Sequence, residues 1–262
     1  MMPFKRHPHF FHPPITAVAQ RSKEWFAQRK KRITSSRLGG LLFLNNEEEY
    51  NQYWEEVLGN AEPEFSEQTK AWMAYGVEHE ERAISSFMDA LTPCAQENAL
   101  LHAFGEPKHR KYKLFMTETD FHPHKEKWAG ASPDGLYVLL DDNNNLIEKG
   151  VLENKCPAKD KRPYPKVKYY YVPQTYWHMT SCGWNHTIFT AWGPRNLRAW
   201  RYRFDPTYWQ ILCNLVRAFR KKCPWNELKQ WIDITKKASE KVANEAEELH
   251  PNLGPRKNGW KQ

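Results

Sequence analysis

Three charged residues stand at the ends of two apolar segments in the middle of the chain. Asp134 precedes the segment 135–140, and Glu153 and Lys155 end the segment 147–155. Both segments have the composition of strands, and the run Asp-Asp-Asn-Asn-Asn at 141–145 predicts the turn of a β-hairpin between them. In an antiparallel pair the start of one strand lies beside the end of the next. We therefore expect Asp134 and Glu153 to meet at one edge.

Two carboxylates this close repel each other, and one of them would normally bind a proton. A hard divalent cation removes the conflict, because Mg²⁺ binds one or two carboxylates together with water and substrate phosphate. Such an ion polarises a phosphodiester and helps to generate hydroxide. Lys155 points to the same face of its strand as Glu153, and an ammonium group there orients the attacking water or stabilises the charge that develops on phosphate. The alternative is an ordinary hairpin with solvated ends, since Glu-x-Lys also occurs at 106–108 and 227–229, where we interpret it as surface charge.

A third carboxylate stands out within the predicted helix of residues 66–91. Four apolar residues of this segment recur at helical spacing and form one stripe, namely Met73, Ile84, Phe87 and Leu91. Glu80 falls on the centre line of the same stripe, and Gly76 leaves room beside it one turn earlier. A lone carboxylate that points inward is unfavourable unless it is paired or binds a metal. Glu80 is therefore either a metal ligand or half of a buried salt bridge.

The segments before this helix also favour helices. A basic helix is predicted at 22–32, with Ser22 as its N-cap and with Trp25 and Phe26 pointing inward. Ser35 or Ser36 is expected to cap a second short helix, whose first turn lies near several arginines and would favour an anion.

After the hairpin the sequence predicts a helix, two strands and a further helical region. Residues 164–184 favour a helix that Pro173 would kink, and "HTIFTAW" and "LRAWRYRF" alternate like strands around a "GPRN" turn. From Pro206 to about Lys237 the pattern is helical and basic. We therefore expect a mixed α/β fold with a single domain over 21–237, a flexible N-terminal tail at 1–20 and a C-terminal tail at 238–262.

The composition favours a polyanionic partner. The 262 residues carry a net charge of +8, and basic clusters lie at 29–32, 159–168, 195–204 and 217–222, with aromatic residues interleaved in the last three. Solvated surfaces would explain any one cluster, but four around one acidic motif favour a groove for a phosphate backbone. No apolar run is long enough for a transmembrane helix, and the N-terminus lacks a secretory signal. The five scattered cysteines fit reduced thiols in a cytosolic or nuclear protein that is not secreted.

The motif "SPDG" at 132–135, followed by "LENKCP" at 152–157, resembles the PD-(D/E)xK nucleases. Within that superfamily the chain is similar to the phage lambda exonuclease and the YqaJ-like viral recombination nucleases, to which the herpesvirus alkaline nucleases are related. Three further stretches agree in order: "WFAQRKKRITSS" at 25–36, "YGVEHEERA" at 75–83 and "YYVPQTYWHM" at 170–179. The resemblance implies a restriction-endonuclease-like core, in which helices flank a central mixed sheet.

The resemblance also implies a role for each matched residue of the acidic motifs. Glu80, Asp134 and Glu153 would be metal ligands, together with the backbone carbonyl of Asn154. Lys155 would act on the attacking water. The ion would be Mg²⁺, for which Mn²⁺ can substitute.

Further matched residues would bind DNA. Arg29, Ser36 and Ser132 correspond to residues that grip the 5′-phosphate of the strand being degraded. Gln174 and Tyr176 stand where the family has two glutamines, and this departure puts the contact of the second one in doubt.

Another departure lies about ten residues before the Asp134 motif. The phage enzyme has a further carboxylate there, whereas this chain has His122 and His124. YqaJ-like sequences often carry His-Pro at this point, so the resemblance suggests His122 as a metal ligand, with a loop histidine as the alternative.

As a whole, the resemblance implies a metal-dependent 5′→3′ exonuclease. It would degrade one strand of linear double-stranded DNA from 5′-phosphorylated ends, in viral or phage-type recombination or genome processing. The alternatives are an endonuclease or RNase on the same fold, a DNA-end-binding protein without catalysis, and a basic scaffold that binds nucleic acid through its tails. The expected partners are double-stranded DNA ends and a single-strand annealing protein, in the cytoplasm or the host nucleus and away from membranes. Relatives include homotrimers and monomers, and both states stay open for this chain.

Overall fold

The protein is represented by a computed structural model, which describes residues 21–30, 32–96, 113–117, 121–124, 128–141 and 143–249. The predicted tail at 1–20 lies outside these residues. The helices are α1 (Lys23–Arg29), α2 (Ser35–Leu41), α3 (Glu47–Leu58), α4 (Glu67–Gln96), the 3₁₀ helix η2 (Tyr169–Tyr171), α6 (Val172–Cys182), α7 (Pro206–Arg220) and α8 (Trp225–Glu245). The strands are β1 (Ile33–Thr34), β2 (Lys113–Thr117), β3 (His122–Pro123), β4 (Ala129–Ala131), β5 (Gly135–Leu140), β6 (Leu146–Lys155), β7 (His186–Gly193), β8 (Asn196–Arg203) and β9 (Glu247–Leu249).

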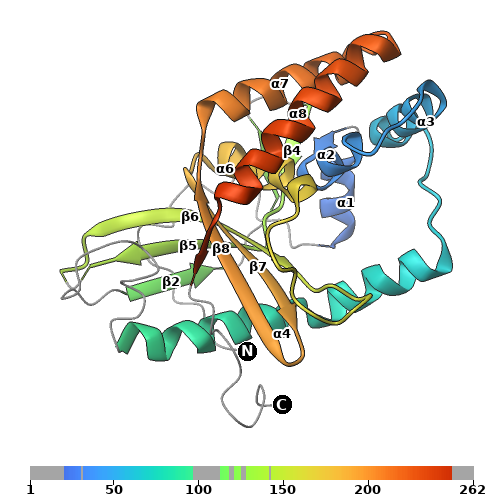
Figure 1. Ribbon diagram of the computed structural model, residues 1–262. Coiled ribbons are helices and arrows are strands. Elements are labelled where there is room, and N and C mark those ends of the chain that lie inside the picture. Colours follow the sequence, from blue (N-terminus) through green and yellow to red (C-terminus); the bar gives the residue numbers. More distant parts are fainter. Residues whose placement is uncertain are drawn as a thin grey trace.

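A mixed sheet forms the centre of the molecule (Figure 1). Within the described residues it has six strands in the order β2-β5-β6-β7-β8-β9, where β6 and β7 run parallel and the other neighbours antiparallel. The short strands β1, β4 and β3 form a second sheet, and β4 leads the chain directly into β5. The predicted mixed sheet is confirmed.

Helices cover both faces of the central sheet. Neighbouring residues of each strand point to opposite faces, so both faces carry apolar side chains. Val151 and Phe189 belong to the larger apolar cluster, which they share with α2, α6, α7 and α8. Leu152 and Ile188 belong to the other cluster, with Ala83 of α4. Figure 1 shows α4 on one side of the sheet and α6, α7 and α8 on the other.

The central hairpin forms where the sequence predicts it. β5 and β6 pair antiparallel, with Gly135 opposite Leu152. In the turn, the carboxylate of Asp141 accepts hydrogen bonds from the backbone N–H groups of Asn143 and Asn145 at 2.9 and 2.7 Å. These local bonds fix the turn. The turn then fixes the β5–β6 register, which places Asp134 beside Glu153.

The apolar stripe predicted for α4 is wrong at its N-terminal end. The side chain of Met73 is 53% exposed, whereas Phe87 is fully buried. The buried residues Ala83 and Phe87 pack on the sheet and the His79 ring still lies 5.4 Å from that of Trp192 on β7, whereas residues 67–74 are mostly exposed. Glu80 therefore lies at the point where α4 leaves the sheet.

Three local expectations near the other helix starts also change. Ser22 caps α1 as predicted, since its hydroxyl accepts from the backbone N–H of Trp25, but Phe26 is 59% exposed instead of inward. Thr34 is the N-cap of α2, so Ser35 is the first residue of that helix and no serine caps it. Pro173 lies in the first turn of α6, a position that needs no backbone N–H, and therefore begins a helix rather than kinking one.

The predicted C-terminal tail begins too early at residue 238. α8 continues to Glu245, and β9 then pairs with β8 at the edge of the sheet. Val242 and Leu249 are buried, although the surrounding segment is highly charged. The charges of this segment obscured a narrow apolar face.

No helix within the described ranges has the length and apolarity needed to cross a membrane.

Candidate active site

The hairpin brings Asp134 and Glu153 to one edge, as the sequence predicts. The backbone N–H of Asp134 donates to the carbonyl of Leu152 at 3.1 Å, and the backbone N–H of Asn154 donates to Asp134 Oδ2 at 2.7 Å. The side chain of Asn154 accepts from the Thr190 hydroxyl on β7 at 2.8 Å, which holds this end of β6 in place. Two carboxylates that are 19 residues apart in the sequence thus share one site.

Both carboxyl groups are difficult to ionise in the absence of a cation. Burial raises the pKa of Asp134 well above its ordinary value, and the negative charge of Glu153 raises it further. Burial also raises the pKa of Glu153, although Lys155 and Gln174 oppose this shift by stabilising the carboxylate. Desolvation and mutual repulsion are the costs that a bound divalent cation offsets.

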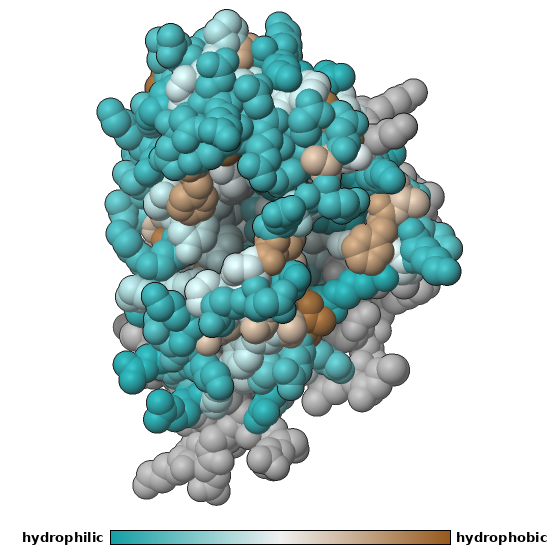
Figure 2. Space-filling model, turned by 90° about the vertical axis from the view of Figure 1, so that its right-hand side faces the viewer, coloured by the Kyte–Doolittle hydropathy of each residue, from teal (hydrophilic) through white to brown (hydrophobic). Residues whose placement is uncertain are grey.

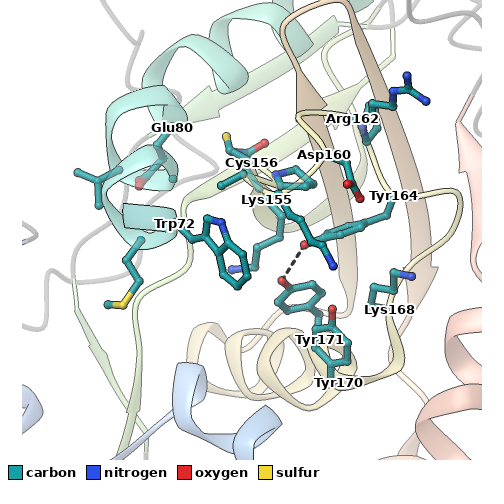
Figure 3. Close-up of a pocket in the computed structure, with 18 of the residues that line it drawn as sticks. Trp72, Glu80, Lys155, Cys156, Asp160, Arg162, Tyr164, Lys168, Tyr170 and Tyr171 are labelled. Carbon is teal, nitrogen blue, oxygen red and sulfur yellow. Dashed lines mark hydrogen bonds between the residues drawn. The ribbon is translucent and has the colours of Figure 1, made fainter. Parts of the chain in front are cut away.

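Lys155 provides a positive charge beside this pair. Its ammonium group donates a hydrogen bond to Glu153 and lies 5.0 Å from the centre of the Tyr171 ring. Burial alone would lower the pKa of Lys155, but the charges of Glu153 and Asp134 outweigh it and raise that pKa. Lys155 is therefore a cationic donor. Figure 3 shows it between Glu80 on α4 and Tyr171.

Glu80 faces the same site from α4 and carries an ion pair of its own. Its carboxylate lies 2.5 Å from a guanidinium nitrogen of Arg21, and its side chain is 25% exposed. The alternative of a fully buried salt bridge is therefore wrong: the pair exists, but water reaches it. The metal-ligand role of Glu80 stays a prediction.

A cleft with a volume of about 1310 Å³ opens in front of these residues. Asp134, Lys155 and Glu80 line it, together with apolar side chains of α4 and a basic, aromatic loop. The α4 wall contains Trp72, Met73 and Val77, and the loop wall contains Lys159, Arg162, Tyr164, Lys168 and Tyr170. Figure 3 shows Trp72 and Glu80 on one side and Tyr164, Lys168 and Tyr170 on the other. In Figure 2 a hollow crosses a mostly hydrophilic face of the molecule and is bordered by apolar patches.

Arg29, Ser36 and Ser132 converge beside the cleft. The Arg29 guanidinium donates to the Ser36 hydroxyl at 2.8 Å and to the Ser132 hydroxyl at 3.4 Å. Thr34 accepts a further bond from Arg29 at 3.4 Å, and Trp25 donates through its indole N–H to Ser132 at 3.1 Å. We call these five residues the hydroxyl pocket. Ser36 also lines the cleft, so the pocket and the carboxylates border one space.

The charge of Arg29 has no acidic counterpart among the described residues. Its guanidinium contacts hydroxyl groups and the face of the Trp25 ring, 4.1 Å away. Burial, and secondarily the positive charge of Arg37, lowers the pKa of Arg29 to about 10. A partly buried cation with neutral neighbours is well suited to an anion.

The two residues at the departing glutamine positions have different surroundings. Gln174 donates its side-chain N–H to Glu153 Oε1 at 2.7 Å, so it supports a carboxylate of the site. Tyr176 is fully buried, and its hydroxyl donates to the Arg203 carbonyl and accepts from the Asp205 backbone N–H, both at 3.1 Å. The place of Tyr176 in the motif assigns it to the DNA-binding set. That assignment is wrong, because the side chain of this α6 residue is buried in the core.

Histidines approach the site from its inner side. His122 lies on β3 and pairs with Ala131 of β4, and Ala131 is three residues before Asp134. The role of His122 as a ligand stays a prediction. His178 of α6 is fully buried. Burial lowers the pKa of His178 well below its ordinary value, and the positive charges of Lys155 and other neighbours lower it further, so its imidazole is neutral.

Sequence reasoning did not select Trp25, Thr34 or His178 as site residues. For two of them a signal exists, because residues four apart lie on one face of a helix. Trp25 is four residues before Arg29, and His178 is four residues after Gln174.

The donor chemistry of the site fits a hard divalent cation. Glu80 and Asp134 line the cleft and Glu153 lies buried beside Asp134, and oxygen donors are what Mg²⁺ and Mn²⁺ prefer. Among the described residues, no three His, Cys, Asp or Glu side chains already have the arrangement of a metal site. In this arrangement Glu80 faces Arg21, and Glu153 faces Lys155 and Gln174.

Comparisons with known proteins identify the family and a shared fold. Two crystal structures share the fold: the alkaline exonuclease LHK-Exo from Laribacter hongkongensis, and LHK-Exo in complex with dAMP. Each is 20% identical to this chain with a TM-score of 0.50, and the match covers 85% of this chain and 100% of that one. No curated protein matches the chain. Residues 24–185 match the YqaJ-like viral recombinase domain, which with the shared fold supports a nuclease of the lambda exonuclease type. The protein belongs to the YqaJ-like viral recombinase domain family.

Proposed function

We propose that the protein is a Mg²⁺-dependent exonuclease that hydrolyses one strand of linear double-stranded DNA from its 5′-phosphorylated end. The observation that carries the proposal is the hydroxyl pocket. It holds a partly buried guanidinium whose hydrogen-bond partners among the described residues are neutral hydroxyl groups, and it borders the same cleft as Asp134 and Lys155.

A terminal phosphate suits this pocket better than an internal one. A phosphate monoester carries more negative charge than a diester, and a guanidinium grips it with paired hydrogen bonds. The Ser36 and Ser132 hydroxyls supply further donors once their hydrogens turn toward the phosphate. Ser132 precedes Asp134 by two residues, so a terminal phosphate held in the pocket brings the first diester of the strand toward the carboxylates.

Mg²⁺, or Mn²⁺ in its place, would be held by the carboxylates of Glu80, Asp134 and Glu153 and by the carbonyl of Asn154. When bound, the ion polarises the phosphodiester and lowers the pKa of water. The raised pKa values of Asp134 and Glu153 support this assignment, because the ionised pair is stable only with a positive charge between its members.

Lys155 serves as a donor in this scheme. Since its pKa is raised, it keeps its proton and does not act as a general base. Its ammonium group donates to the attacking water or to a phosphate oxygen, where it stabilises the charge that grows in the transition state.

The two walls of the cleft suit a nucleic acid strand. Lys159, Arg162 and Lys168 offer cations to a phosphate backbone, and Trp72 and Met73 offer an apolar surface to bases. The net charge of +8 favours the same class of substrate. LHK-Exo was crystallised with dAMP, and we propose that 5′-mononucleotides are the products here as well.

The test compares linear duplexes that differ only in a 5′-phosphate or a 5′-hydroxyl, together with a covalently closed circle. We expect faster release of labelled mononucleotides from the phosphorylated end and none from the circle. Arg29→Ala should remove most of the phosphate preference while changing the rate on the hydroxyl end much less. Lys30→Ala, a change at the exposed neighbouring cation, is the matched control and should keep the preference.

Equal rates on both ends, or prompt cutting of the closed circle, would contradict the exonuclease proposal and favour an endonuclease on this fold. Equal loss of preference in Lys30→Ala would contradict the pocket, because general electrostatic attraction would then explain the effect.

A further inference from the structure

His178 lies between the hydroxyl pocket and the carboxylates, inside the protein. Its Nε2 atom is 2.8 Å from the hydroxyl oxygen of Ser35, the first residue of α2. Its Nδ1 atom is 3.3 Å from Glu153 Oε2. One imidazole thus touches the helix that carries Ser36 and a carboxylate of the proposed metal site.

The hydrogen on the imidazole can be assigned from its two neighbours. A carboxylate only accepts hydrogen bonds, whereas a serine hydroxyl both donates and accepts. Glu153 Oε2 and His178 Nδ1 are buried, and neither has a hydrogen-bond partner within the described residues. A hydrogen on Nδ1 satisfies both atoms after a small turn of either side chain, and Nε2 then accepts from the Ser35 hydroxyl. The opposite tautomer would leave two lone pairs facing each other at a buried contact.

The other oxygen of Glu153 is already fixed. Lys155 and Gln174 both donate to Oε1, so Oε2 is the oxygen whose direction depends on His178. Residues behind a ligand commonly set its orientation in this way, and their loss weakens metal binding by about 10- to 100-fold.

We propose that His178 is a positioning residue, which directs the Glu153 carboxylate toward the metal and ties the start of α2 to it. The Ser35–His178–Glu153 chain would set the spacing between the hydroxyl pocket and the metal ligands, and thereby the position of the first phosphodiester. This inference rests on the proposed function, since it assumes a metal at Glu153 and a phosphate at Arg29.

Two amide substitutions separate the two ends of the imidazole. The amide nitrogen of His178→Asn falls near the place of Nδ1, whereas that of His178→Gln falls near Nε2. Binding of Mn²⁺ alone is measured by the electron paramagnetic resonance of the free ion, in the full-length protein without DNA. We expect His178→Asn to stay within about 2-fold of the wild type and His178→Gln to bind about 10-fold more weakly. Cys182→Ala, a change at a buried residue one turn further along α6, controls for lost packing and should bind Mn²⁺ normally.

A second measurement addresses the spacing. The ratio of rates on 5′-phosphate and 5′-hydroxyl ends should fall in Ser35→Ala, which breaks the chain at α2 and leaves Glu153 untouched. Thermal melts of every variant establish that it is folded. Normal Mn²⁺ binding in His178→Asn together with weak binding in His178→Gln would not be expected if His178 only filled space in the core.

The failures of the two ideas are distinguishable. If the wild type binds no Mn²⁺, the proposed metal-dependent function fails and the inference fails with it. If the wild type binds Mn²⁺ and His178→Gln binds it equally well, only the inference is overturned. Rescue by Gln but not by Asn, or an unchanged end preference in Ser35→Ala, also overturns it.

Discussion

At the scale of single residues, each carboxylate of the site accepts a hydrogen bond from the protein, although the carboxylates still repel one another. Asp134 accepts from the Asn154 backbone, Glu153 from Lys155 and Gln174, and Glu80 from Arg21. Each carboxylate thus has a donor of its own in the protein. A bound cation would compete with Lys155 and Arg21 for two of them, so these two contacts should govern metal affinity.

Asp134→Asn should reduce turnover by at least about 10²-fold and leave DNA binding nearly intact, because the carboxylate acts on the transition state. Single-turnover cleavage and equilibrium binding to the same duplex measure the two quantities. Asp160→Asn alters an exposed carboxylate in the same cleft and should keep the rate within about 2-fold. Near wild-type cleavage by Asp134→Asn would refute the assignment of this residue.

Glu80→Gln should raise the Mg²⁺ concentration needed for half-maximal rate and change the melting temperature little. The reason is that its ion pair with Arg21 is partly exposed, and such pairs contribute about 0–1 kcal/mol. Arg21→Gln removes the same pair but keeps the carboxylate, so it should lower the Mg²⁺ requirement. If both variants move the requirement in the same direction, Glu80 acts through the ion pair and is not a ligand.

At the scale of elements, the segments that the sequence predicts well are those whose pattern is local. The β5–β6 hairpin follows from strand alternation and from the Asp141 turn, and it alone brings Asp134, Glu153 and Lys155 together. The positions of Met73 and Tyr176 depend on which part of a helix packs on the sheet, and no local pattern fixes that. His178 reaches the site only because α6 packs against β6. This is a tertiary contact that the local sequence pattern does not predict.

The packing of α8 and β9, which the charged composition of this segment hides, can be tested by mutation. Leu249→Ala should lower the free energy of unfolding by about 2–4 kcal/mol, because it removes a fully buried side chain from β9. Glu240→Ala changes an exposed residue of α8 and should alter stability by less than about 0.5 kcal/mol. Denaturant unfolding measures both. An unchanged Leu249→Ala variant would restore the prediction of a loose tail from residue 238.

At the scale of the whole molecule, the site makes the stability of the metal-free protein depend on pH. Asp134 and Glu153 have raised pKa values in the folded state, so the folded protein binds more protons than the unfolded chain. Their contribution to stability is full below the ordinary carboxyl pKa and is lost as pH rises through the raised values. His178 has the opposite sign, because its lowered pKa makes the folded state bind fewer protons up to the ordinary histidine range.

Asp134→Asn isolates the carboxylate contribution, since the amide cannot ionise. Relative to the wild type in the presence of EDTA, this variant should gain stability as the pH rises from the ordinary carboxyl pKa through the raised one, and no further above it. Excess Mg²⁺ should reduce the gain, because the ion stabilises the wild-type carboxylates. Parallel wild-type and variant curves across the pH range would contradict the raised pKa of Asp134.

The long helix α4 is held against the sheet near Ala83 and Phe87, whereas its N-terminal part, which forms a wall of the cleft, is exposed. Ala83 and Phe87 are buried against the sheet, while Trp72 and Met73 are 41% and 53% exposed. Local unfolding of the exposed turns therefore requires much less free energy than unfolding of the anchored ones. In a hydrogen-exchange experiment, the amides of residues 68–74 should exchange early, and those near Phe87 should exchange only with the whole fold. The wall of the cleft that carries Trp72 and Met73 can thus open locally while Glu80 keeps its place beside the sheet.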